Sequence, residues 1–142
     1  MLKNVDEYGE SDNSYIEAGG YDGISLLVHD FYINMTMFSE AKKIRGMHPP
    51  DLAESRKKLV YFLCEWLGGD QLYSEHYGDI NIPRVHSGLN IGSAERDAWL
   101  YCMKKAINGQ QYKESFKEYL FAQLKIPADR IKQRCTKKIL IS

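Results

Sequence analysis

The sequence has few cysteines and no long hydrophobic run. Its 142 residues include three cysteines, Cys64, Cys102 and Cys135, which lie far apart and form no Cys-x-x-Cys motif. A disulfide scaffold or a cysteine-rich zinc site is therefore not expected, and we expect Cys64 and Cys102 to be small core residues on helices. No stretch approaches the roughly 18–20 apolar residues that a membrane-spanning helix requires.

Net charge is also absent, because 19 basic residues balance 19 acidic ones. This balance argues against nucleic acid as the main partner, since duplex binding usually requires a net positive face. The first seven residues carry acidic side chains where a signal peptide would have its apolar stretch. We therefore expect a soluble, cytoplasmic protein with neither a nucleic-acid nor a membrane partner.

The chain lacks both a convincing β-strand alternation and an internal repeat, and its apolar residues recur instead at three and four positions. The length fits one domain, and the pattern predicts an all-α fold. The expected long helices span residues 22–37, 51–67, 94–108 and 112–125. The composition divides the chain into a flexible N-terminal arm at 1–17, a domain at 18–126 and a C-terminal extension at 127–142.

Capping signals mark the expected helix ends. Asp22, Asp51 and Ser93 are expected N-caps, and Asp51 has a glutamate three residues later, as in a capping box. The pair Gly68-Gly69 is expected to close the 51–67 helix. Pro127 is expected to end the last helix, leaving a frayed basic tail, and residues 70–83 are expected to form an irregular loop.

These helices are compatible with a plain bundle that has nothing inside, and the corresponding function is that of a haem-free helical interaction module. Three features fit that reading badly: the long loop before His86, an aromatic content of 12%, and polar residues at inward positions. A lone histidine such as His86 is commonly a structural residue. It can also be the single axial ligand of a haem, because the porphyrin supplies four other ligands. The sequence has no Cys-x-x-Cys-His motif, so any haem would be bound non-covalently.

Other polar residues are candidates for contacts with a bound ligand. Tyr32 and Trp99 fall on inward helix faces, where each is either a core aromatic or a hydrogen-bond donor to a ligand. His48 either faces solvent or overhangs the same pocket. Ser55, with Leu59 and Phe62, forms one helical stripe. A hydrolase built on Ser55 or Cys102 with His48 lacks both a nucleophile elbow and an orienting acid.

Several strings of residues are similar to one known family, the truncated haemoglobins of group II, over roughly residues 18 to 126. The matching strings are Phe31-Tyr32, His48 to Leu52, Phe62-Leu63, Trp66 to Gly69, Leu72-Tyr73, Arg84 to His86, Ala94 to Leu100 and Cys102-Met103. The resemblance implies a 2-on-2 sandwich, in which two antiparallel helix pairs (22–37 with 51–67, and 94–108 with 112–125) enclose haem b, the non-covalent iron protoporphyrin IX.

The same resemblance implies a role for each candidate residue. His86 would be the proximal iron ligand, Tyr32 and Trp99 the distal donors, and Phe62 a packing contact of the porphyrin. Ser55 and Leu59 would line the distal side. Arg84, Lys57 and Tyr73 are candidate partners of the haem propionates. His48 departs from the family, which usually has phenylalanine or tyrosine there, and we expect it either to donate to the ligand or to control it by protonation. Tyr32 or His48 could also bind the iron weakly in the unliganded state.

The function expected from this resemblance is reversible binding of oxygen and other diatomic gases (O2, CO, NO). Several donors should slow oxygen release, which suits sensing or detoxification of reactive species better than bulk oxygen transport. An unidentified reductase would keep the iron reduced, and the expected assembly is a monomer or weak dimer. The alternative is a haem enzyme with peroxidase activity or with nitric oxide- or nitrite-converting activity. One observation counts against it: the sequence shows no evident acidic partner that would strengthen His86 as the proximal ligand.

Overall fold

Helices make up the secondary structure of the part of the chain that the computed structural model describes, residues 8–78 and 91–141. For residues 133–141 it describes the backbone alone. The long helices are α2 (Gly20–Met37), α4 (Ala53–Trp66), α7 (Ser93–Asn108) and α8 (Glu114–Ile141). Shorter ones are α1 (Asn13–Glu17), the 3-10 helix η1 (Ser39–Ala41), α3 (Lys42–Gly46) and α5 (Leu72–Tyr77). The all-α expectation is confirmed.

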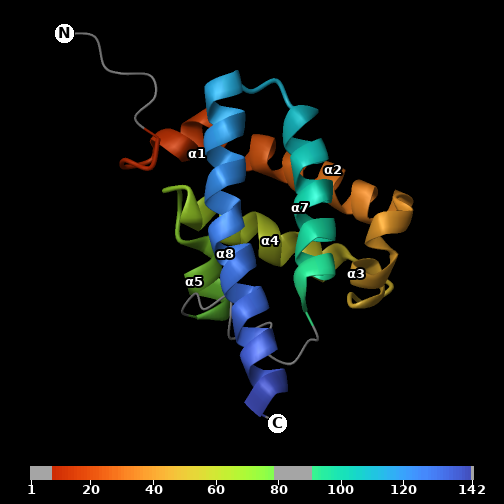
Figure 1. The fold of residues 1–142 in the computed structure, drawn as a ribbon. Coiled ribbons are helices and arrows are strands. Elements are labelled where there is room, and N and C mark those ends of the chain that lie inside the picture. Colours follow the sequence, from red (N-terminus) through yellow and green to blue (C-terminus); the bar gives the residue numbers. More distant parts are fainter. Residues whose placement is uncertain (1–7, 79–90, 142) are drawn as a thin grey trace, which may run out of the picture.

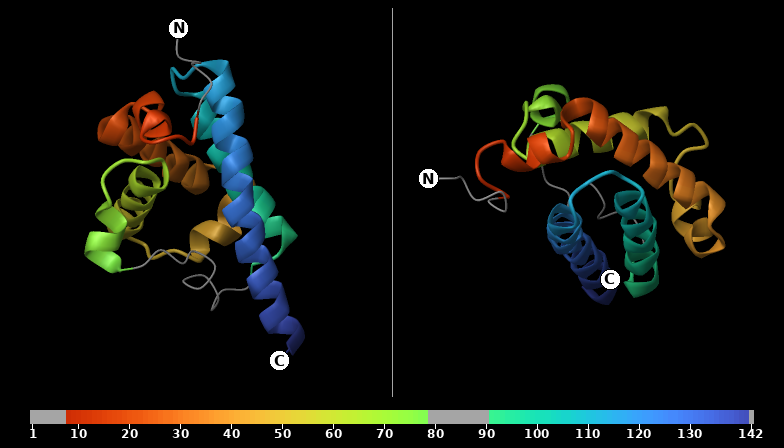
Figure 2. Two further views of the ribbon diagram at one scale, coloured as in Figure 1. Left: turned by 90° about the vertical axis from the view of Figure 1, so that its left-hand side faces the viewer. Right: turned by 90° about the horizontal axis from the view of Figure 1, so that it is seen from above.

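The long helices form two layers of two. Helices α2 and α4 run antiparallel in one layer, and α7 and α8 run antiparallel in the other, with the two pairs crossing (Figures 1 and 2). Helix α2 packs against both α4 and α7 and so joins the layers. The expected 2-on-2 sandwich is confirmed. No described helix combines the length and the apolarity needed to cross a membrane.

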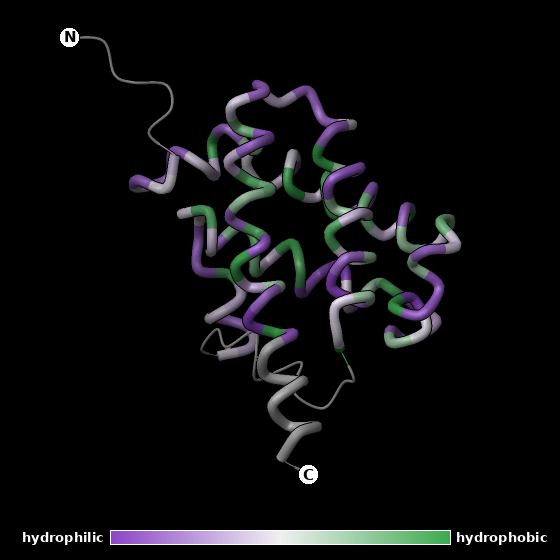
Figure 3. Tube along the Cα trace, in the orientation of Figure 1, coloured by the Kyte–Doolittle hydropathy of each residue, from purple (hydrophilic) through white to green (hydrophobic). Residues whose placement is uncertain are grey.

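The core lies where the inner faces of the helices meet, as the alternation of hydrophilic and hydrophobic segments along each helix shows (Figure 3). The largest fully buried side chains include Phe31, Met35, Leu63, Met103 and Phe116. Each such side chain stabilises the fold by about 1.5–3 kcal/mol relative to leaving it exposed. Cys64 and Cys102 are buried and unpaired, as expected of small core residues.

The end of α4 confirms the prediction made from its two glycines. Gly68 has a φ of +99°, the left-handed conformation that glycine adopts without a steric penalty. Its N–H donates to the Glu65 carbonyl, and the N–H of Gly69 donates to the Cys64 carbonyl, at 3.1 and 2.8 Å. This pattern is a Schellman motif, which satisfies the last carbonyl groups of the helix.

The predicted N-cap of α4 is wrong by one residue. The helix begins at Ala53, and Asp51 accepts the Ala53 N–H at 2.9 Å from outside the helix, in a turn of its own. Glu54 does not complete a capping box, because its carboxylate accepts a hydrogen bond from the Tyr77 hydroxyl. A contact distant in the sequence therefore replaces the local one.

The other two predicted caps lie inside their helices. Helix α2 begins at Gly20, so Asp22 lies in its first turn, where a carboxylate still interacts favourably with the helix dipole. Ser93 is the first residue of α7. The cap of α7 comes instead from Glu95, whose carboxylate accepts the Gly92 N–H at 2.7 Å.

The segment expected as a flexible arm, residues 1–17, contains a helix and specific contacts in its described half. The Tyr8 ring meets Phe116 edge-on, with centroids 5.2 Å apart. The N–H of Tyr15, in α1, donates to the Leu67 carbonyl at 3.0 Å. Its polar composition concealed these contacts, because they are made with α4 and α8 rather than with sequence neighbours.

Helix α8 does not end at Pro127, which corrects the prediction of a frayed tail. The helix continues through Pro127 to Ile141 and extends past the other helices (Figure 1). A proline inside a helix costs about 3 kcal/mol through its missing N–H and its clash with the preceding turn. Tertiary contacts on both sides offset that cost: Leu124 and Ala128 are buried, and Asp129 binds Arg96 of α7.

Candidate functional site

Tyr32 occupies the inner face of α2, where the helical repeat that also buries Val28 and Met35 places it. Its side chain is 5% exposed. The hydroxyl donates to the Ser55 carbonyl of α4 at 3.5 Å, longer than the usual O–H···O distance of about 2.5–3.0 Å. Burial raises the pKa of Tyr32 to about 12. The phenol therefore stays protonated, and its weak contact leaves it able to donate to a ligand.

His48 lies beside Tyr32, in the short connection between α3 and α4. The two rings meet edge-on with centroids 5.8 Å apart. The Nδ1 atom of His48 is 2.8 Å from the Ile44 carbonyl, which can only accept, so Nδ1 carries a proton and donates. In the neutral ring Nε2 is consequently an acceptor, and it becomes a donor only when the ring is protonated.

Trp99 approaches the same region from α7. Its ring packs edge-on against Phe31 of α2, with centroids 5.1 Å apart, and Phe31 in turn contacts the Tyr32 ring at 5.0 Å. The side chain is half-buried. Among the residues that the structure describes, none accepts a hydrogen bond from its indole N–H. Because the indole is a donor only, this group can serve an acceptor atom of a ligand.

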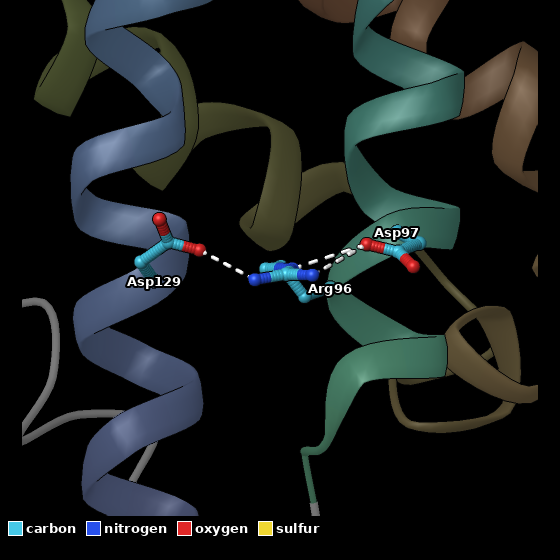
Figure 4. Close-up of polar contacts among 3 residues, drawn as sticks. All are labelled: Arg96, Asp97 and Asp129. Atoms are coloured by element: carbon cyan, nitrogen blue, oxygen red, sulfur yellow. Dashed lines mark hydrogen bonds and ion pairs between the residues drawn. The ribbon is translucent and has the colours of Figure 1, made fainter.

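Polar contacts fix the start of α7 and thereby the position of Trp99. Arg96, one turn earlier, binds Asp129 of α8 at 2.8 Å and Asp97 at 3.0 Å (Figure 4). Lys43 of α3 binds the Glu95 carboxylate at 3.1 Å. The Gly92 N–H, and then Lys43, lower the pKa of Glu95, so the carboxylate stays charged. The α7 helix is thus tied to α3 on one side and to α8 on the other.

The predicted stripe on α4 faces the interior, opposite Tyr32. Ser55 and Leu59 are half-buried and Phe62 is buried. Phe62 stacks on Trp66 at 5.8 Å and meets the Tyr73 ring edge-on at 6.4 Å. The stripe therefore combines one backbone acceptor at Ser55 with an apolar and aromatic surface.

Tyr73 is positioned by α5, a helix inside the region expected to be an irregular loop. The Glu65 carboxylate accepts hydrogen bonds from both the N–H and the hydroxyl of Ser74, at 2.8 and 2.5 Å. These bonds hold the first turn of α5 against α4, and they bury Tyr73 to 8% exposure. Residues 79–83, the remainder of the expected loop, lie outside the described residues.

The structure does not bring every predicted residue to this site. Lys57 points away from the Ser55–Phe62 stripe, with its ammonium 5.7 Å above the Tyr61 ring. Arg84 and His86 lie outside the described residues. The structure brings the other predicted residues together in two groups. Tyr32 contacts His48 and Ser55 directly and Trp99 through Phe31. Phe62, on the same stripe of α4 as Ser55 and Leu59, contacts Tyr73 of α5.

Two residues that contact the predicted ones had no assigned role in the sequence reasoning. Phe31 joins Tyr32 to Trp99 by ring contacts, and Trp66 stacks on Phe62. Both belong to apolar helical repeats, so their periodicity predicted burial. It carried no signal that distinguishes a residue packed against other side chains from one that also supports a site.

The arrangement fits a large, flat, mostly apolar cofactor better than a bare metal ion. Within residues 8–78 and 91–132, no three His, Cys, Asp or Glu side chains gather closely enough to hold a metal. Leu59 and Trp99 stay partly exposed although they face inward, and the Trp99 indole N–H has no acceptor among the described residues. Apolar walls with a few donors are the usual lining of a cofactor pocket.

Comparison with known proteins decides the family. Residues 13–133 match the family of bacterial-like globins. The chain is 35% identical over 120 residues to the group 2 truncated hemoglobin YjbI of Bacillus subtilis (strain 168), covering 84% of this chain and 89% of that one. The chain belongs to the group II truncated haemoglobins. The family implies a haem cofactor and the binding of diatomic gases.

Solved structures of related proteins agree with this assignment. The group II 2-on-2 hemoglobin from Agrobacterium tumefaciens superposes with a TM-score of 0.80 at 32% identity, over 84% of this chain and 92% of that chain. The cold-adapted truncated hemoglobin from Pseudoalteromonas haloplanktis TAC125 gives a TM-score of 0.81 at 29% identity, over 83% and 95%. This truncated haemoglobin therefore shares the arrangement of α2, α4, α7 and α8 with solved members of its family.

Proposed function

We propose that this truncated haemoglobin binds oxygen, carbon monoxide and nitric oxide reversibly at haem b, with His86 as the proximal iron ligand. The observation that carries the proposal is the convergence of two hydrogen-bond donors from different helices. The Tyr32 and Trp99 rings both contact Phe31. Among the described residues, the Tyr32 hydroxyl has only a long contact with the Ser55 carbonyl, and the Trp99 indole N–H has no acceptor. Such donors are useful where a bound molecule carries partial negative charge.

Different residues of the pocket would contact the porphyrin, its propionates and the bound gas. Leu59 and Phe62 would pack against the porphyrin and exclude water from it, and Arg84 and Tyr73 would bind its propionates. The haem would supply the iron that binds the diatomic gas. Tyr32, which burial keeps protonated, donates to the ligand from α2, and Trp99 donates from α7. Lys57, above the Tyr61 ring, is assigned no propionate contact.

His48 adds a donor that depends on pH. Because its Nδ1–H is committed to the Ile44 carbonyl, only the protonated ring can donate through Nε2. Protonation would then strengthen the retention of a ligand beside Tyr32. In the neutral ring Nε2 carries a free lone pair, and in this form His48 could bind the iron weakly in the unliganded state.

Two or three donors should slow the release of oxygen, which suits sensing or detoxification better than bulk transport. A relative of known structure, 34% identical, is described as an oxygen-avid haemoglobin from Bacillus subtilis, and this supports oxygen as a ligand here. The proposal includes a reductase that keeps the iron ferrous, a cytoplasmic location, and a monomer or weak dimer as the assembly.

The visible spectrum of the protein reconstituted with haemin tests the proposal. We expect a sharp Soret band when the reduced protein binds carbon monoxide, and the His86→Ala variant should lose or visibly alter it. His29, which is exposed on the outer face of α2, provides the matched control, and His29→Ala should leave the spectrum unchanged. Failure of the wild-type chain to take up haem would refute the proposal, and an unaltered His86→Ala spectrum would refute the ligand assignment.

A further inference from the structure

A chain of aromatic rings runs from the candidate haem pocket to the surface of α4 and α5. The Tyr73 ring contacts Phe62 at 6.4 Å and Tyr77 at 5.1 Å between centroids. Tyr77 lies 6.4 Å from Tyr61. Tyr73 is buried, whereas Tyr77 and Tyr61 are only half-buried. The phenols therefore connect an interior position with solvent through neighbouring rings.

Tyr77 is the member of this chain with a base within reach. Its hydroxyl donates to the Glu54 carboxylate at 2.8 Å. Burial, and then this hydrogen bond, raise the pKa of Tyr77 to about 12, so the phenol keeps its proton at neutral pH. A phenol that loses an electron becomes strongly acidic, and Glu54 can then accept the proton along the existing hydrogen bond.

The charges around the chain favour loss of the electron and the proton together. The Lys58 ammonium lies 5.3 Å from the centroid of the Tyr77 ring, and the Lys57 ammonium lies 5.7 Å from that of Tyr61. A positively charged oxidised ring would be repelled by either ammonium. A neutral phenoxyl radical avoids that repulsion, provided that the proton leaves, and at Tyr77 Glu54 provides the acceptor.

We propose that Tyr73, Tyr77 and Tyr61 form a path along which oxidising equivalents leave the haem pocket for the protein surface when hydrogen peroxide is reduced there. This inference rests on the proposed function, which places haem beside Phe62 and Tyr73. In the balanced reaction one hydrogen peroxide becomes two waters, while two tyrosine phenols each lose one electron and one proton to become phenoxyl radicals. Electrons move inward along the rings from Tyr77 and Tyr61. The Tyr77 proton moves to Glu54, the proton of half-buried Tyr61 is released to solvent, and two protons taken up from solvent complete the two waters.

Other tyrosines lack this combination of features. Tyr32 is buried in the pocket, but its hydroxyl faces the Ser55 carbonyl, which is not a base. Tyr8 and Tyr119 contact each other and Phe116, and among the described residues no ring contact joins them to Phe62 or Tyr73. Tyr101 is exposed and contacts Phe38. Among the tyrosines compared, we therefore expect oxidation at Tyr77 and Tyr61.

The test locates the radicals rather than measuring turnover. The haem-loaded protein is treated with hydrogen peroxide in the presence of the spin trap 2-methyl-2-nitrosopropane, and the trapped residues are mapped by peptide mass spectrometry. We expect adducts on Tyr77 and Tyr61. Glu54→Gln keeps an acceptor for the Tyr77 hydroxyl but removes the base, and it should lower the Tyr77 adduct severalfold. Tyr77→Phe should lower the Tyr61 adduct as well, because it removes the intermediate phenol.

Tyr101→Phe is the matched control, since it removes an exposed phenol that lies outside the path, and it should leave the adducts on Tyr77 and Tyr61 unchanged. The Soret absorption of each sample separates the two proposals. If the wild-type protein takes up haem but the adducts form on Tyr8, Tyr101 or Tyr119 instead, the path is refuted and the proposed function stands. Equal Tyr77 adducts in wild type and Glu54→Gln would overturn the role of Glu54. Failure to take up haem would refute both proposals.

Discussion

The ring of His48 meets that of Tyr32 edge-on, with centroids 5.8 Å apart, while its Nδ1–H is held by the Ile44 carbonyl at 2.8 Å. This contact places a titratable ring directly beside a hydroxyl that stays protonated throughout the physiological range. The Tyr32 hydroxyl is therefore a constant donor, whereas Nε2 of His48 is a donor only when the ring is protonated.

The first prediction concerns the pH dependence of oxygen release. In the wild-type protein the oxygen dissociation rate should fall as the solution becomes more acidic, because protonated His48 gains a donor at Nε2. His48→Phe should remove this dependence while keeping the ring contact with Tyr32. Stopped-flow measurement of oxygen dissociation over a series of pH values checks this. His29→Gln, on the exposed face of α2, should retain the wild-type profile. A His48→Phe profile identical to that of the wild type would exclude His48 as the acid-dependent donor.

The second prediction concerns the two constant donors. Tyr32→Phe and Trp99→Phe should each accelerate oxygen release by roughly 10- to 100-fold, since a hydrogen bond to a charged or partly charged acceptor contributes about 1.5–3 kcal/mol. Carbon monoxide carries less negative charge when bound, so its release should change much less. Comparison of both single variants with the double variant then measures the coupling between the donors. Oxygen and carbon monoxide affected to the same extent would point to altered packing instead of lost hydrogen bonds.

The third prediction concerns the stability that depends on Gly68. A Cβ atom there would lie 2.1 Å from the Ser11 carbonyl oxygen, and the φ of +99° is strained for any other residue. Gly68→Ala should lower the free energy of unfolding by at least about 1–3 kcal/mol. Gly46 is the matched control, because a Cβ there meets no atom within 4 Å, and Gly46→Ala should be close to neutral. Urea unfolding of both variants measures the difference, and equal effects would contradict the close approach of Ser11.

The fourth prediction concerns stability in acid. The folded pKa of Glu95 is lowered, so its charge stabilises the protein above the ordinary glutamate pKa, and this contribution is lost as the pH falls through the folded value. Glu95→Gln should therefore be less stable than the wild type at neutral pH, and the difference should shrink in acid. Glu118→Gln changes an exposed carboxylate on α8 and should show no such convergence. Thermal unfolding at neutral and acidic pH checks both variants, and a constant difference would contradict the role of the Glu95 charge.

Much of the site could be predicted from residue type and spacing. Tyr32 and Trp99 recur with the apolar residues of their own helices, so their inward direction follows from the 3.6-residue period. Ser55, Leu59 and Phe62 share one face of α4 for the same reason. The contact between Phe31 and Trp99 could not be predicted in this way, because it depends on how α2 and α7 are placed against each other.

Lys57 and Glu54 illustrate the limit of local reasoning. A lysine beside a candidate pocket is a reasonable partner for a propionate, yet α4 turns Lys57 to the side of Tyr61. Glu54 stands three residues after Asp51, as a capping box requires, yet it binds Tyr77 from α5. Each residue has two chemically suitable partners. The packing of α5 on α4 selects Tyr77 for Glu54, whereas Lys57 lies over a ring one turn later on its own helix.

By itself the sequence determined the positions of the long helices, the closure of α4 at Gly68 and the residue types that line the interior. These features depend on periodicity and backbone conformation within a few neighbouring residues. Only the tertiary structure decided that α8 continues through Pro127 and that Tyr73, Tyr77 and Tyr61 form a connected row. The cost of a proline and the partner of a phenol depend on atoms far away in the chain. Arg96 of α7 binds Asp129 of α8, and Leu124 and Ala128 are buried on the two sides of Pro127. These contacts offset the free-energy cost of a proline inside a helix.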